Sequence, residues 1–147
     1  MPMRLSFSRN WISIIEDEVL AKFSGDTVLL EQVVSDFICT KAIAEFDSYL
    51  NVYIRQYVAR KNLTKGVPKL NAFETWKIKK YLTENFGIEK DSLQCLDQYR
   101  SFDNFIQERD MISHNPCSAT ITIEKTKHYI RIAEEIIDCV KEILIEN

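Results

Sequence analysis

Apolar residues recur at three- and four-residue steps along most of this chain, which is the spacing of helices that bury one face. The pattern predicts five helices, at about residues 8–23, 27–61, 72–85, 92–114 and 124–145. Gly25, the loop 62–70, Gly87 and Pro116 separate them. Helices with one apolar stripe each must pack on one another, so we expect an all-α, up-and-down bundle of four or five helices.

Some local features of this bundle are also predicted. Asp26 or Thr27 would cap the second helix, and Asp91 would cap the fourth. The second helix would be ~50 Å long, so a bend or break within it is expected. The segment 119–124 is polar and β-branched and would be extended.

Length and composition place the chain among single-domain globular proteins. Its 147 residues are 46% apolar and 28% charged, and only three glycines and three prolines are present. We therefore treat residues 1–147 as one domain with one core. There is no apolar run of membrane-spanning length, and "MPMRLSFSRNW" is not a secretory signal, so a cytoplasmic protein without a membrane partner is expected.

The four cysteines are widely spaced and do not form a zinc or redox motif. We expect reduced, mostly buried thiols at Cys39, Cys95, Cys117 and Cys139. His114 and Cys117 together would supply half of a metal site, but His128 is the only other imidazole and zinc needs about four ligands. The prediction is therefore no metal and no cofactor.

Charge is unevenly distributed along a chain whose net charge is −3. Between positions 55 and 80, eight basic residues stand against a single acidic one, Glu74. Such a block would hold a polyanion through its phosphates, or it would only aid solubility. We name it the basic block: Arg55, Arg60, Lys61, Lys65, Lys69, Lys77, Lys79 and Lys80.

A charged motif interrupts the apolar stripe of the fourth helix. At ~100° per residue, Arg109 falls within the stripe of Phe102, Phe105 and Ile106, while Asp110 and His114 fall on its edge, one turn apart. An unpaired buried guanidinium costs several kcal/mol.

Three accounts of Arg109 remain open: an ion pair with Glu45 or Asp47, an extended side chain that reaches solvent, or a cleft or subunit interface where an anion is the partner.

The motif contains the groups needed to cleave RNA without a metal. His114 would exchange protons, and the C-terminal end of its helix favours the imidazolium form. Asp110 would orient the ring, and Arg109 would stabilise charge on the phosphoryl group. Ser113 and Asn115 flank the histidine as supporting residues. The nucleophile would be the 2′-hydroxyl, so DNA would not be a substrate.

Arg109-Asp-Met-Ile-Ser-His114 resembles the Arg-x-x-x-x-His signature of HEPN domains, and residues 30–50 look like the second-helix region of the RiboL-PSP type. The resemblance covers most of residues 28–146. It implies a helical homodimer in which the signature stripe becomes part of the seam. It also implies a metal-independent endoribonuclease of a toxin–antitoxin or phage-defence system, with Arg109 and His114 catalytic and a possible cognate antitoxin.

Two departures qualify this resemblance. Some HEPN toxins carry a modifiable tyrosine two residues after the histidine, where this chain has Pro116. Other HEPN domains do not cleave RNA, which leaves an alternative function: a module that binds RNA or a nucleotide, or a regulatory interaction domain.

Overall fold

A computed structural model of the chain describes residues 2–25, 27–63, 66–70, 74–114 and 122–147, with side chains described except at 27–29 and 112–114. These residues form α-helices, one π-helical segment and one 3-10 segment, and they contain no strand. None of the described helices is long and apolar enough to cross a membrane. The all-α prediction is confirmed. The elements are α1 (Ser6–Ile14), η1 (Ile15–Leu20), α2 (Thr27–Arg60), α3 (Thr75–Phe86), η2 (Lys90–Tyr99), α4 (Phe102–His114) and α5 (Ile123–Glu146).

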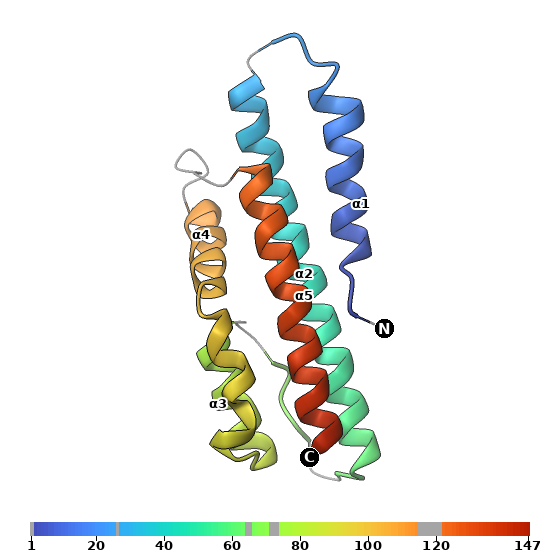
Figure 1. Ribbon diagram of the computed structural model, residues 1–147, viewed down its shortest axis with the longest axis vertical. Coiled ribbons are helices and arrows are strands. Elements are labelled where there is room, and N and C mark those ends of the chain that lie inside the picture. The colour runs from blue at the N-terminus through green and yellow to red at the C-terminus, as the bar shows by residue number, and fades with distance from the viewer. Residues whose placement is uncertain (1, 26, 64–65, 71–73, 115–121) are drawn as a thin grey trace.

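The two longest helices, α2 and α5, form the centre of the bundle (Figure 1). They run in the same direction, and Arg60 at the end of α2 donates to the carbonyl of Leu144 near the end of α5. Helix α1 packs antiparallel to α2, and α4 packs antiparallel to α5 on the other side, while α3 packs on η2 (Figure 1). The up-and-down order therefore holds for these two neighbouring pairs, whereas the central pair is parallel.

Helix α2 forms without the break expected from its length, as one helix from Thr27 to Arg60. Its apolar residues reach the core over most of that length, from Ile38 through Phe46 to Ile54. Continuous packing against α5 supplies the tertiary stabilisation that keeps such a long helix in one piece.

The predicted fourth helix is in fact two elements, η2 and α4, joined by a turn at Arg100 and Ser101. Leu93 and Phe102 explain this, because both side chains are almost fully buried. In one straight α-helix they would point in opposite directions, about 180° apart. The turn allows both to face the core. Asp91 lies inside η2, whose N-cap is Glu89, so it is not the predicted cap.

The first predicted helix also differs, because its second half is π-helical from Ile15 to Leu20. The amide of Ala21 donates to the carbonyl of Glu16, five residues back. The end of α3 agrees with prediction: Gly87 follows its last turn at φ +64°, a conformation that favours glycine. Thr122, in extended conformation, caps α5 through its side chain. The predicted extended segment is wrong at Ile123 and Glu124, which form the first turn of α5, and its residues 119–121 lie outside the described residues, as does Asp26.

Three carboxylates fix the N-terminal segment to the bundle through its backbone amides. Met3 donates to Asp138 at 3.0 Å, and Leu5 donates to Glu134 at 2.7 Å, both on α5. Glu45 of α2 accepts the first amides of α1 at 3.0 and 3.1 Å. These amides have no acceptor within the helix, and the positive end of the helix dipole favours a carboxylate there. The arrangement determines where the side chains of residues 3–9 lie.

The cysteine prediction is wrong for two of the four thiols. Cys95 of η2 and Cys139 of α5 form a disulfide, while Cys39 is a buried free thiol. The spacing along the sequence gave no sign of the pair, because only packing of η2 on α5 brings the two residues together. Cys117 lies outside the described residues.

Candidate functional site

The helix that carries the charged motif is held in place by aromatic packing. Phe102 lies against Phe46 of α2 with ring centroids 4.9 Å apart, and Phe105 stacks on Tyr129 of α5 at 4.7 Å. Together with Ile106, these side chains form the predicted core-facing stripe, which is confirmed. These three side chains pack within one chain, and the prediction that the stripe becomes part of a dimer seam stays a prediction. The face of α4 that stays exposed includes Asp110 and Met111.

Arg109 lies at the margin of this stripe with a quarter of its side chain exposed. Its Nε and Nη2 both donate to Oδ1 of Asp110, at 2.9 and 2.7 Å. Glu45 accepts from α1 and Asp47 accepts from Asn51, and the ion pair seen for Arg109 is with Asp110, not with either carboxylate considered in the first account. The guanidinium is instead oriented by the next residue of its own helix.

The ion pair between Glu108 and Lys125, at 2.7 Å, joins the same turn of α4 to the start of α5. Hydrogen bonding to Glu108 raises the pKa of Lys125. On the α2 side, burial raises the pKa of the Cys39 thiol, although the nearby Arg109 cation opposes the shift. The turn of α4 that carries Glu108 and Arg109 thus packs between α2 and α5.

Three buried side-chain oxygens around this turn have no hydrogen-bond partner among the described residues: Ser35 Oγ, Asp36 Oδ1 and Glu108 Oε2. Burial raises the pKa of Asp36, because the charged carboxylate loses hydration there. Unpaired buried acceptors are costly, so a donor that reached them would be bound favourably.

The remaining motif residues are only partly described. His114 and Ser113 belong to the last turn of α4, but their side chains lie outside the described residues. Asn115 lies outside them altogether, and so does Lys65 of the basic block. The predicted contact between Asp110 and His114 therefore stays a prediction. Within the described part of the chain, no group of three or more His, Cys, Asp or Glu side chains could hold a metal ion.

The end of α2, which carries Arg60 of the basic block, lies at the opposite end of the bundle from the motif. Arg60 meets α5 at Leu144, whereas Glu108 meets it at Lys125, and these positions are about 28 Å apart along a helix. Lys77, Lys79 and Lys80 pair with acidic neighbours, and Arg55, Lys61 and Lys69 are exposed. Arg60 therefore lies far from the Arg109 turn, whereas Lys77 is two residues from Thr75, whose amide donates to Asp103 at the start of the motif helix.

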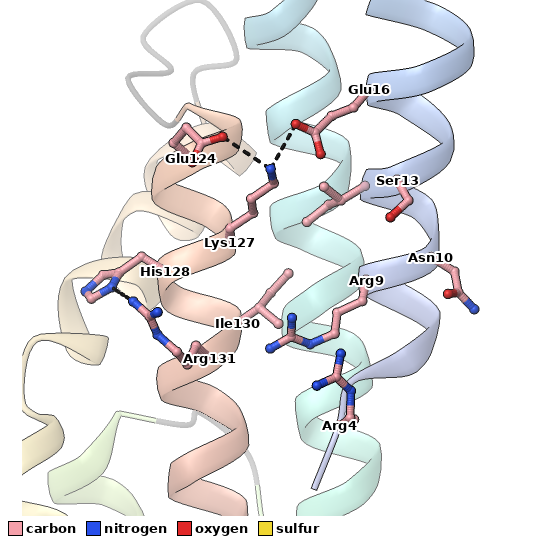
Figure 2. Close-up of a pocket in the computed structure, with 11 residues that line it drawn as sticks. Arg4, Arg9, Asn10, Ser13, Glu16, Glu124, Lys127, His128, Ile130 and Arg131 are labelled. Carbon is pink, nitrogen blue, oxygen red and sulfur yellow. Dashed lines mark hydrogen bonds and ion pairs between the residues drawn. The ribbon is translucent and has the colours of Figure 1, made fainter.

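A second group of basic residues, which the sequence analysis did not connect, lies nearer the motif end. Residues of the N-terminal segment and α1 face residues of α5 across a groove of about 740 Å³ (Figure 2). The signal available in the sequence was the density of basic and imidazole groups at positions 125–131. Their partners stand more than a hundred residues earlier, so no local pattern reveals the group. It comprises Arg4, Arg9, Lys127, His128 and Arg131.

Comparison with known proteins gives no match to a family model, to a characterised protein or to a solved structure. The HEPN resemblance thus rests on the residues of the motif and on their place in the chain.

Proposed function

We propose that the chain is a metal-independent endoribonuclease of the HEPN type, acting in the cytoplasm as a toxin or phage-defence effector. The observation that supports this most directly is the arginine itself. Its guanidinium is oriented by two hydrogen bonds to Asp110 on the same helix, and His114 follows it five residues later. A fixed cation near a group that exchanges protons at neutral pH is what RNA cleavage without a metal requires.

The proposed reaction is an in-line transesterification. The 2′-oxygen of a ribose attacks the adjacent phosphorus, and the bond from phosphorus to the 5′-oxygen of the next nucleotide breaks. His114 takes part in the proton transfers, in which the 2′-hydroxyl loses a proton and the leaving oxygen gains one. Arg109 stabilises the charge that builds on the phosphoryl oxygens. The products are a 2′,3′-cyclic phosphate and a 5′-hydroxyl.

A homodimer would use the face of α4 that the chain leaves open. Met111 is 58% exposed and adjoins Asp110, so two copies meeting through this face would place two motifs next to one cleft. Mass measurement at several protein concentrations tests the dimer, and Met111→Lys should shift it to monomer. A mass that stays monomeric at high concentration would contradict this part of the proposal.

The decisive experiment compares RNA cleavage by the wild type with cleavage by His114→Ala and Arg109→Gln, in EDTA. Loss of an acid–base group or an oriented cation should slow cleavage by about 10²-fold or more. Gln107→Ala, an exposed change on the same helix, and Arg100→Gln, an exposed arginine in the preceding turn, are the matched controls and should cleave like the wild type. RNA with a single 2′-deoxy position should resist cleavage at that position.

Different outcomes separate this proposal from the alternative. Cleavage that survives His114→Ala removes the histidine from the mechanism. RNA that is retained but never cut indicates the non-catalytic binding module. A cognate antitoxin is tested by co-expression with the neighbouring gene, which should restore growth if the chain is a toxin.

A further inference from the structure

Large apolar side chains gather on the outer surface of α1 and the first half of α2. On α1, Phe7, Trp11 and Ile14 fall within about 60° of one another around the helix, and they are 50%, 37% and 50% exposed. On α2, Val33 and Phe37 stand about one turn apart and are 60% and 45% exposed. We name these five residues the α1–α2 face.

Ring contacts join the two helices into one surface. Trp11 packs edge to face against Phe7, with ring centroids 6.2 Å apart, and against Phe37 at 5.9 Å. The other flank of α1 is already engaged, because Arg9 and Glu16 turn toward α5 (Figure 2). Helix α1 lies at the edge of the bundle (Figure 1), and its apolar flank stays exposed to solvent within the described part of the chain.

The π-helical segment that follows α1 extends this apolar stripe. A π-type hydrogen bond spans five residues, so a side chain lies close to the one five positions earlier. Leu20 shows this step on the core side, since it follows the buried Ile15 by five residues and packs against the core. Val19 follows Ile14 by five residues and is 38% exposed. The exposed stripe is therefore continuous for about 18 Å, from Phe7 to Val19.

The extent of the α1–α2 face matches what one half of a homodimer interface needs. Its five side chains are 37–60% exposed, so they present roughly 400–500 Å² of apolar surface if an aromatic side chain offers about 150–250 Å² in full. A standard interface covers about 800 Å² on each partner and is about 65% apolar in homodimers, which is about 500 Å². Isolated exposed apolar residues are ordinary, whereas a contiguous patch of this size marks an interaction site.

The two ends of the face carry opposite charges. Lys41 stands one turn before Glu45 on α2, and Glu45 accepts the amide of Phe7 at 3.1 Å, so Lys41 lies at the Phe7 end. At the other end, Glu18 stands four residues beyond Ile14 and is 62% exposed. A polyanion or an anionic membrane would need an excess of basic residues around the patch, which this balance of charges does not supply.

We propose that the α1–α2 face binds a second copy of this chain about a two-fold axis near Trp11 and Ile14. Such an axis reverses the face, so that Lys41 of each copy comes opposite Glu18 of the other while the apolar side chains meet at the centre. Lys22 bonds Glu18 within one chain, but this pair is exposed and contributes little. The apolar area supplies the affinity, and the two charge pairs at the rim set the orientation.

The inference is independent of the proposed RNA cleavage and of the contact proposed for α4. Met111 lies on α4, which packs on the opposite side of the bundle from α1 (Figure 1). The two contacts would therefore form in separate concentration-dependent steps, and each would be removed by its own variant. Met111→Lys removes the α4 step and should leave the step through the α1–α2 face unchanged.

The test is sedimentation equilibrium of the full chain over a wide range of protein concentration. Trp11→Glu should raise the dissociation constant of the α1–α2 step at least tenfold, because it places two carboxylates beside the axis. Trp76→Glu, the same change at a tryptophan of α3 that is 52% exposed, is the matched control and should leave the step unchanged. Val33→Glu, at the most exposed residue of the face, should also weaken it, and unchanged melting temperatures check the fold.

Exchanging the two charges tests the orientation. Lys41→Glu and Glu18→Lys should each weaken association, because each places like charges together across the axis, whereas the double variant should restore it. A double variant that associates no better than either single variant would contradict the two-fold arrangement. A step that survives both Trp11→Glu and Val33→Glu, or Met111→Lys protein that stays monomeric at the highest concentration, would overturn the inference.

Discussion

The ion pair between Arg9 and Glu134 gives the most stringent test of the energetics of this fold. Glu134 is 6% exposed and accepts three hydrogen bonds, one from the Leu5 amide and two from the Arg9 guanidinium. Arg9→Met would leave the carboxylate buried with the amide alone. Removing one partner of a fully buried pair costs about 3–5 kcal/mol. Because the Arg9 side chain is 34% exposed, solvent screening reduces the expected cost to ~2–3 kcal/mol.

Urea denaturation under non-reducing conditions measures this cost as a change in the free energy of unfolding. The internal control is Lys22→Met, which removes an ion pair with Glu18 whose side chains are 67% and 62% exposed. That pair should contribute only about 0.3 kcal/mol. The difference in cost between Arg9→Met and Lys22→Met reports the effect of burial on the ion pair, because both changes replace a cation by methionine.

A double variant tests whether the cost of Arg9→Met comes from the charge left on Glu134. Arg9→Met/Glu134→Gln removes both charges but keeps an amide oxygen that can accept from Leu5, so it should be more stable than Arg9→Met alone. The reasoning is refuted if Arg9→Met costs no more than Lys22→Met, or if the double variant is the less stable of the two.

Two further predictions concern pH and redox state. Because burial raises the pKa of Asp36 above its unfolded value, the wild type should lose stability as pH rises through that pKa. Asp36→Asn should therefore stabilise the protein at pH 7 but not in acid, as urea denaturation at both pH values would show; equal effects would contradict this. Reducing the Cys95–Cys139 disulfide, with a sequence separation of 44, should cost about 4 kcal/mol. Dithiothreitol should lower the melting temperature of the wild type but not of Cys139→Ser, and a temperature that stays unchanged after full reduction would refute the estimate.

Local helical signals were reliable where packing agreed with them. The stripe of Phe102, Phe105 and Ile106 is buried as its spacing predicts, and Gly87 ends α3. The prediction of a single helix at residues 92–114 failed, because it assumed one straight helix axis. The side chains before and after Arg100 reach the same core only because the chain turns there. Apolar residues three or four positions apart identify one face of a helix. They do not show whether the helix axis changes direction between two short elements.

For the candidate site, the sequence by itself determined which residues stand on α4 and that Arg109 lies on the side of its apolar stripe, because both follow from helical geometry. Only the tertiary structure decided what surrounds them. It paired Arg109 with Asp110 instead of Glu45 or Asp47, it placed Arg60 of the basic block at the far end of α5, and it joined Cys95 to Cys139.

The groove illustrates the same division. Arg131 stands in a stretch dense in basic and imidazole groups, but nothing in the sequence connects that stretch with Arg4. Both line one groove because carboxylates on α2 and α5 bind the amides of the N-terminal segment and fix its path. Helical periodicity acts over a few residues and can be read locally, whereas contacts between segments more than a hundred residues apart depend on how the whole bundle packs.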